Sequence, residues 1–326
     1  MKSYSKNILC IVSLISTVAC SVPDSTPIER KVLSESGVYA ADISNDASVA
    51  VVSSVNGAVD VWDLEAKEKR FTWRHQGEGL NLVDNVRLSP DNTVAVTSDD
   101  EAFALWDMTS GEPLGFWRID ESTIRDVAVS NNGNAIIVGR SNGKVLFFEP
   151  YTGRRLEFLG HEEKINSVDI SANGRFALTG GNDYRAYLWD TDSGQIIHAF
   201  THPHRVTKVV LDQLSRYVFT ADSQDDSQIW DVQSGEPISQ LRFIERQIIF
   251  TAAEFSEDGK YLLTGSPAKR LILWDVKSGE SISEWRVTPN TGPAPQSAVV
   301  YAVGFDELQP ISISSNGNLA HWKLSQ

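Results

Sequence analysis

The sequence predicts an all-β fold in which one structural unit is repeated seven times. Three observations predict it. A tripeptide centred on an aromatic residue recurs along the chain, a second large apolar residue follows it at a fixed offset, and short β-branched or apolar runs lie between glycine-containing turns. The first twenty residues show none of these features and have the composition of a targeting signal.

The recurring tripeptide marks each repeat. Its clear copies are Val61-Trp62-Asp63, Leu105-Trp106-Asp107, Leu188-Trp189-Asp190, Ile229-Trp230-Asp231 and Leu273-Trp274-Asp275, and its weaker copies are Phe147-Phe148-Glu149 and His321-Trp322-Lys323. The central positions, 62, 106, 148, 189, 230, 274 and 322, follow one another at intervals of 41 to 48 residues. A period of this length indicates one supersecondary unit repeated along the chain.

A second column of large apolar residues follows the first. Eleven residues after the first six central positions lie Trp73, Trp117, Leu159, Phe200, Leu241 and Trp285. Glycine-containing turns separate the two columns at Ser110-Gly111, Thr152-Gly153, Ser193-Gly194, Ser234-Gly235 and Ser278-Gly279. Expected strands are Val49–Val52, Val94–Thr97, Ala135–Val138, Phe176–Thr179, Tyr217–Thr220 and Tyr261–Thr264. All nine tryptophans fall in the two columns, where large aromatic residues are expected to hold neighbouring sheets together.

These repeats resemble WD40 repeats, each of which forms a four-stranded blade of a β-propeller. The resemblance covers all seven repeats and implies a seven-bladed propeller over residues 29–326. The seventh repeat supplies expected strands near Val299–Phe305, Pro310–Ser314 and Asn318–Leu324, but no fourth strand. We expect Glu29–Leu33 to complete this last blade, as in WD40 propellers, and so to remove exposed sheet edges.

The family also implies a hydrogen-bonded network of a histidine, an aspartate, a strand hydroxyl and the tryptophan indole. The candidates are His75, Ser98, Asp100 and Trp106 in the second repeat, and His161, Asp183 and Trp189 in the fourth, with Gly181 where the hydroxyl is expected. A histidine, an aspartate and a serine can form a hydrolase triad. The family gives these positions a structural role, so no catalytic residue is assigned.

Two further groups of residues have the composition of a site. His198, His202 and His204 have the parity of one strand face, but Pro203 interrupts the run and no Cys or Asp lies within it, so no metal ligand is assigned. A column expected to face a central channel reads Asp42, Arg87, Ala128, Asp169, Val210, Glu254 and Gly304. Its mixed charge favours a water-filled channel over a catalytic centre, where several acids or histidines would converge, and no cofactor is assigned.

The expected binding surface lies where the outer strands end. Arg74, Arg118, Arg242 and Arg286 come directly after the second apolar column. Arginine is favoured at protein interfaces because its planar group makes paired hydrogen bonds. Two long loops, 76–84 and 288–297, lie on the same face and could carry contacts. The alternative is that these arginines pair with local acids such as Asp120 and Glu121.

Residues 1–19 predict a bacterial lipoprotein signal peptide. Two lysines precede a short apolar stretch, and Ala19-Cys20 resembles a lipobox, although Thr17 stands where leucine is usual. The alternatives are a secretory signal cleaved after Ala19 and an uncleaved anchor helix. Residues 20–28 are expected to supply a lipidated Cys20 and a tether. Ser21, rather than an aspartate, indicates the outer membrane, with the propeller in the periplasm.

Composition narrows the function. Acidic residues outnumber basic ones 43 to 29, which argues against nucleic acid as a partner. An apolar content of 41% excludes a disordered chain, and two cysteines, both within the first twenty residues, exclude a disulfide framework. We expect a non-catalytic scaffold that binds envelope or outer-membrane proteins and is anchored by lipid to the periplasmic side of a Gram-negative outer membrane, with envelope assembly as a candidate process. The alternative is a channel-based propeller enzyme, or a periplasmic sensor of a small ligand or peptide.

Overall fold

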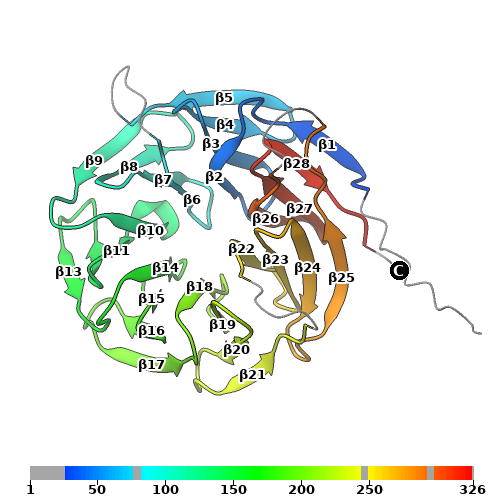
Figure 1. Ribbon diagram of the computed structural model, residues 1–326. Helices are drawn as coiled ribbons and strands as arrows, with labels where there is room; N and C mark the ends of the chain where they lie inside the picture. Colours follow the sequence, from blue (N-terminus) through cyan, green and yellow to red (C-terminus); the bar gives the residue numbers. More distant parts are fainter. Residues whose placement is uncertain (1–25, 76–81, 244–248, 292–296, 325–326) are drawn as a thin grey trace, which may run out of the picture.

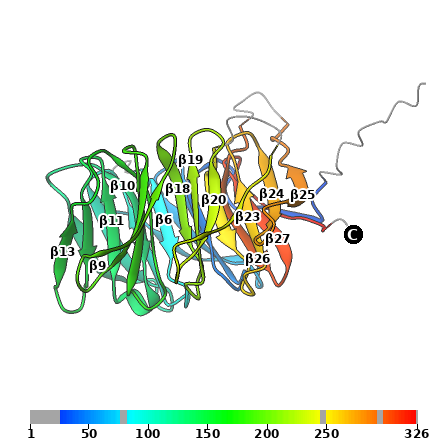
Figure 2. The same cartoon turned by 90° about the horizontal axis from the view of Figure 1, so that it is seen from below.

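The described residues form a disc of seven antiparallel sheets. The computed structural model describes residues 26–75, 82–243, 249–291 and 297–324. Each sheet has four strands, and the sheets stand as blades around a central axis (Figure 1). Seen from the edge, the disc is about as deep as its inner strands are long (Figure 2). The one helical element in these ranges is a 3-10 turn at Asn131–Gly133. The predicted all-β, seven-bladed propeller is confirmed.

The strands follow one another from the centre of the disc outwards. Blade 1 has β2 (Val38–Ile43), β3 (Val49–Ser54), β4 (Val59–Asp63) and β5 (Glu68–Trp73); blade 2 has β6 (Asn85–Leu88), β7 (Val94–Ser98), β8 (Ala102–Asp107) and β9 (Pro113–Arg118). Blade 3 has β10 (Ile124–Val129), β11 (Ile136–Arg140), β12 (Val145–Phe148) and β13 (Arg155–Phe158); blade 4 has β14 (Ile165–Ile170), β15 (Phe176–Gly181), β16 (Arg185–Asp190) and β17 (Ile196–Thr201).

The remaining blades repeat the same order. Blade 5 has β18 (Val206–Leu211), β19 (Tyr217–Asp222), β20 (Ser227–Asp231) and β21 (Pro237–Gln240); blade 6 has β22 (Ala252–Phe255), β23 (Tyr261–Gly265), β24 (Arg270–Asp275) and β25 (Ser281–Arg286). Blade 7 has β26 (Val300–Asp306), β27 (Gln309–Ser314) and β28 (Asn318–His321), and its outer strand is β1 (Glu29–Val32).

Strand β1 closes the ring. It pairs antiparallel with β28, from Glu29 opposite His321 to Val32 opposite Asn318. Backbone hydrogen bonds from Ile28 N to His321 O (2.9 Å) and from Leu33 N to Gly317 O (2.8 Å) flank this pairing. The first and last strands of the chain therefore share one sheet, as predicted, and the edge that β28 would otherwise expose is covered.

The aspartate of the recurring tripeptide shapes the turn after the third strand in blades 2, 4, 5 and 6. Its Oδ1 accepts the backbone N–H of the serine three residues later, at 2.7 Å in the Asp107–Ser110 pair and 2.8 Å in the Asp190–Ser193, Asp231–Ser234 and Asp275–Ser278 pairs. The glycine that follows each of these serines has a φ between 70° and 77°. This left-handed conformation explains why glycine stands there.

Most central residues of the tripeptides bury their rings on or directly after the third strands, whereas Trp62 and Trp230 are only partly buried. Trp189, Trp274 and Trp322 are at most 1% exposed. In the second column Trp73, Phe200, Leu241 and Trp285 are at most 3% exposed. Each packs on the tripeptide residue of the next blade or in the same apolar cluster. The two columns therefore form the joints between blades.

The second column is wrong at Leu159, which is 67% exposed. Phe158 fills the position instead and stacks on Trp189 with ring centroids 4.5 Å apart. In blade 2 a bulge skips Leu114, so that Leu105 opposes Gly115 and Trp106 opposes Pro113. The β12–β13 pair has no such bulge. Because the outer strand of blade 3 lacks the extra bulged residue, its buried position comes one residue earlier than in blade 2.

Part of the sequence-based prediction lies outside the described residues. This is the case for the signal peptide 1–19, for Cys20 and most of the tether 20–28, and for the centres of the two long loops, 76–81 and 292–296. In the ranges that are described, no helix has the length and apolar character to cross a bilayer.

Candidate functional site

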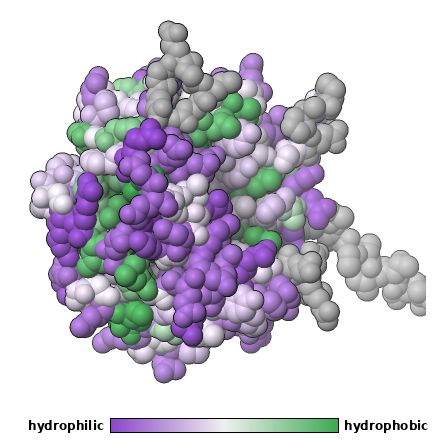
Figure 3. All heavy atoms as spheres, turned by 60° about the vertical axis from the view of Figure 1, so that its left-hand side comes forward, coloured by the Kyte–Doolittle hydropathy of each residue, from purple (hydrophilic) through white to green (hydrophobic). Residues whose placement is uncertain are grey.

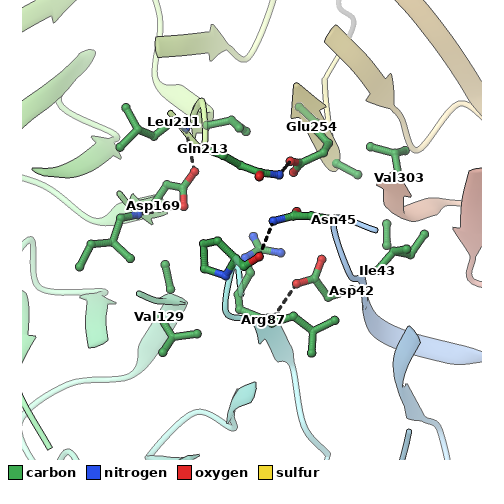
Figure 4. A pocket seen from close by; sticks show the side chains of 18 of the residues that line it. Asp42, Ile43, Asn45, Arg87, Val129, Asp169, Leu211, Gln213, Glu254 and Val303 are labelled. Carbon is green, nitrogen blue, oxygen red and sulfur yellow. Dashed lines mark hydrogen bonds between the residues drawn. The ribbon is translucent and has the colours of Figure 1, made fainter. Parts of the chain in front are cut away.

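The predicted channel column lies on the seven innermost strands. Asp42, Arg87, Ala128, Asp169, Val210 and Glu254 line one central cavity of about 100 Å³, and Gly304 lines a hollow next to it. Asp42, Arg87, Asp169 and Glu254 come from four blades and converge on the same space (Figure 4). Alternation along each innermost strand therefore places this column towards the axis, as expected.

Three channel aspartates are bound to the backbone of the next blade. Asp42 Oδ2 accepts from Leu88 N at 2.7 Å, and Asp169 Oδ2 accepts from Leu211 N at 2.7 Å (Figure 4). Asp126 Oδ2 accepts from Val168 N at 3.0 Å. In each pair the donor belongs to the blade that follows in the chain. These carboxylates thus link adjacent inner strands, and one oxygen of each is occupied by a structural hydrogen bond.

Sequence reasoning missed two charged residues of the channel. Asp126 on β10 is 6% exposed and Lys208 on β18 is 7% exposed. Each lies two residues before a predicted column position, so both share its strand face. The Nη2 of Arg87 lies 3.4 Å from Asp126 Oδ1. Two cations therefore offset the acids, and the parity of the strand was the signal that could have identified them.

Burial shifts the protonation of the channel groups. It raises the pKa of Asp169 to about 6 and, together with the negative charges of Asp42 and Asp169, raises the pKa of Glu254 to about 8. Burial, with the nearby Arg87, lowers the pKa of Lys208 to about 8. The Nε2 of Gln213 lies 3.4 Å from Glu254 Oε1. The channel can therefore exchange protons near neutral pH, but its aspartates remain tied to the scaffold.

The hydrogen-bonded network of blade 2 differs from the prediction by one residue at two positions. The hydroxyl of Thr97, rather than that of Ser98, lies 2.6 Å from His75 Nε2 and accepts from Trp106 Nε1 at 2.8 Å. The acid beside His75 Nδ1 is Asp99, at 3.4 Å, rather than Asp100. Thr97 lies two residues after Ala95, the partner of Trp106 in the β7–β8 register, and therefore points to the same side as the indole.

Blade 4 matches the prediction for the imidazole but not for the indole. His161 Nδ1 lies 2.9 Å from Asp183 Oδ2, and its Nε2 lies 2.9 Å from the hydroxyl of Thr179. Thr179 therefore supplies the hydroxyl that was sought at Gly181. Within the described residues, Trp189 Nε1 has no hydrogen-bond partner. This tryptophan contributes by burial and by stacking on Phe158.

Blade 5 holds a third network that sequence reasoning dismissed. His202 Nε2 lies 2.8 Å from Thr220 Oγ1, which accepts from Trp230 Nε1 at 2.8 Å. Asp226 lies beside the other ring nitrogen of His202, at 2.8 Å. His198 is separate from this group, since its Nε2 lies 2.9 Å from the carbonyl of Val232.

The four candidate surface arginines lie at the perimeter of the disc, where an outer strand meets the next blade. Outer strands such as β5, β13, β17 and β25 run along the circumference (Figure 1). Arg118 Nη2 lies 2.5 Å from Glu101 Oε2, and Arg242 Nη1 lies 3.4 Å from Glu280 Oε1. Arg74 and Arg286 are exposed. The arginines therefore occupy four separate junctions between blades.

The side of the disc that carries β9 and β13 is largely hydrophilic, with smaller apolar groups between (Figure 3). Exposed apolar side chains on and beside these strands include Leu114, Phe116 and Leu159. Scattered exposed apolar residues of this kind are normal on a protein surface.

The fold and the repeat define the class of this protein. Residues 153–190 match the family described as "WD40: WD domain, G-beta repeat". The match runs from the outer strand of blade 3 through the first three strands of blade 4. The matched repeat thus begins with an outer strand and ends with a third strand. The described strands follow the same order, from the outer strand β1 to the third strand β28. The chain is thus an all-β seven-bladed propeller consistent with the WD40 type. No curated protein matched the chain.

Proposed function

We propose that this protein is a non-catalytic protein-interaction scaffold, held by a lipid on Cys20 at the periplasmic face of the outer membrane. WD40 propellers generally bind protein partners and are usually scaffolds. The location at the outer membrane and the partner-binding surface are the finer parts of this proposal. The non-catalytic role rests chiefly on the channel, whose acids hold neighbouring blades together.

The bonding of the channel side chains bears on whether they could act as catalysts. A catalytic centre needs groups that are free to meet a substrate. Here Asp42, Asp126 and Asp169 each accept a backbone N–H of the next blade. The enclosed cavity has about 100 Å³, and the adjoining hollow that Gly304 lines has about 490 Å³. The tied aspartates favour binding on the outer surfaces of the disc.

The place of β1 supports the proposed tether. This strand is the outer strand of blade 7 and lies at the perimeter of the disc (Figure 1). A lipidated residue before it would join the propeller at its edge. Such an attachment leaves the broad surfaces and most of the perimeter accessible to partners, and envelope proteins are the partners available in that compartment.

Site-specific photocrosslinking in cells tests the proposed surface. A photoreactive residue at position 74 or 118 is expected to capture one dominant envelope protein. The control is position 277, an exposed lysine in the turn between β24 and β25. Equal capture from positions 74, 118 and 277, or no capture from any of them, would contradict binding through the arginine junctions.

A further inference from the structure

The outer end of the β19–β20 hairpin in blade 5 gathers two histidines and two aspartates. His202 and His204 lie between β17 and β18, while Asp222 and Asp226 lie at the end of β19 and in the turn that follows. His202, Asp222 and Asp226 each direct one ligand atom into the group, and these atoms lie within 4.8 Å of one another. All three side chains are nearly or fully buried.

His202 is held in a fixed orientation. Its Nε2 lies 2.8 Å from Thr220 Oγ1, and this hydroxyl accepts from Trp230 Nε1 at 2.8 Å. The other ring nitrogen, Nδ1, lies 2.8 Å from Asp226 Oδ2 but lacks the alignment of a hydrogen bond with any partner in the described chain. A buried imidazole nitrogen thus faces a carboxylate oxygen without a good hydrogen bond between them.

The two carboxylates are also oriented by their own hydrogen bonds. Asp222 Oδ1 accepts from Gln224 N at 2.8 Å and from Asp226 N at 3.1 Å, and Asp222 Oδ2 lies 3.1 Å from His204 Nδ1. Asp226 Oδ1 accepts from Gln228 Nε2 at 2.8 Å. In both residues one oxygen is used by the scaffold and Oδ2 faces a histidine.

A comparison with blades 2 and 4 isolates what is special here. In the strand register the central tryptophan lies opposite Ala95 in blade 2, Ala177 in blade 4 and Val218 in blade 5. Four positions after these residues lie Asp99, Gly181 and Asp222, respectively. Blade 4 reaches its histidine from the turn instead, through Asp183. Blade 5 has Asp222 at the first position and reaches His202 from the turn through Asp226. Two carboxylates and two imidazoles therefore meet at this end of the hairpin, with Asp226 beside His202 and Asp222 beside His204.

We propose that His202, Asp222 and Asp226 bind one divalent transition-metal cation such as Zn²⁺. Imidazole nitrogen and carboxylate oxygen are ligands that Zn²⁺ accepts at about 2.0–2.2 Å, so groups already this close need only small rotations to share an ion. A cation would offset the negative charge of the two buried carboxylates. Three protein ligands leave a fourth position to water, and His204 orients Asp222 from outside, as outer hydrogen bonds commonly do for metal ligands.

Calorimetric titration of the metal-free, full-length protein with ZnCl₂ tests this site. We expect one ion per chain and a rise in melting temperature. Asp222→Asn keeps an oxygen for the backbone amides but loses the charge, and is expected to weaken Zn²⁺ binding at least tenfold. The matched control is Asp183→Asn in blade 4, which should leave the affinity unchanged, as should His198→Gln.

If Asp222→Asn lowers the melting temperature of the metal-free protein, His204→Gln gives a second measurement. This change affects a half-exposed side chain, and it is expected to weaken Zn²⁺ binding severalfold without changing the fold. The proposal is overturned if the wild type does not bind Zn²⁺. It is equally overturned if Asp222→Asn and His204→Gln bind as the wild type does, or if Asp183→Asn weakens binding as much as Asp222→Asn.

Discussion

Trp73 at the end of β5 in blade 1 stacks on Trp106 in β8 of blade 2, with ring centroids 4.9 Å apart and planes inclined by 8°. The second apolar column of one blade thus meets the tripeptide column of the next. Further joints of this kind pair Trp117 with Phe148, Phe158 with Trp189, Phe200 with Trp230, and Trp285 with Trp322. At the joint where the ring closes, Lys31 Nζ lies 4.7 Å above the ring of Trp62 instead.

Adjacent residues in blade 3 allow a direct test of these joints. Phe158→Ala removes a buried ring that stacks on Trp189, so we expect the free energy of unfolding to fall by about 3–5 kcal/mol. Leu159→Ala truncates a side chain that is 67% exposed, and its effect should stay within about 0.5 kcal/mol. Urea denaturation of the two variants measures the difference. The reverse order would restore Leu159 to the second column and contradict the shifted register.

Removal of the closing strand should destabilise the whole propeller. Deletion of residues 26–34 removes β1 and leaves β28 as an exposed edge. We expect a lower melting temperature and a tendency to aggregate. The control is Glu29→Ala, which removes the exposed ion pair with Lys67 and should leave the melting temperature nearly unchanged, because exposed ion pairs add little to stability. An unchanged melting temperature after the deletion would show that blade 7 is stable with three strands.

The channel predicts a pH-dependent loss of stability. Folded Glu254 keeps its proton until about pH 8, whereas its ordinary pKa is 4.5. Between these values the folded chain binds more protons than the unfolded chain, so the free energy of unfolding falls as the pH rises. Glu254→Gln should reduce the loss between pH 6 and pH 8 by about 1 kcal/mol, less than the full linkage value because the side chain is partly exposed to the channel.

The matched control for this pH dependence is Glu236→Gln, which changes an exposed carboxyl in the turn between β20 and β21. Denaturation curves at pH 6, 7 and 8 for both variants provide the comparison. If Glu254→Gln and the wild type lose stability in parallel over this range, Glu254 is ionised throughout and the assignment of its proton is wrong.

The proposed lipid anchor is tested with the two cysteines of the chain. Cys20→Ala should abolish labelling by radioactive palmitate and release the protein from the membrane fraction, because the lipid chains supply the membrane affinity. Cys10→Ala serves as the control, since it changes a cysteine inside the expected signal peptide, and should remain labelled and membrane-bound. Membrane retention of Cys20→Ala would favour an uncleaved anchor helix over lipidation.

The sequence was sufficient to predict the seven blades and their closure, because both depend on a period that the tripeptides repeat along the chain. It failed where a local irregularity changed that period. The missing bulge of blade 3 moved the buried position from Leu159 to Phe158. The hydroxyl of blade 2 was misplaced by one residue, at Ser98 instead of Thr97, because only the register with Trp106 decides which side chain points to the indole.

The candidate sites were predictable only in part, for a related reason. The channel column follows strand parity, so Asp42, Asp169 and Glu254 could be placed correctly. The cluster in blade 5 could not. Asp222 and Asp226 lie about twenty residues after His202, and their approach depends on how the β19–β20 turn folds back over the preceding loop. The sequence pattern had grouped His202 with His198, which the structure directs to Val232.

The closing strand also determines how the molecule responds to mechanical load. The chain enters the propeller through the four residues of β1, which pair with β28 alone among the described strands. Tension applied at the N-terminus reaches this pairing first, starting at the Ile28–His321 hydrogen bond, before it reaches any other blade. We therefore expect the strand that completes the ring to be the first to detach under tension at the N-terminus, so that the disc opens at blade 7.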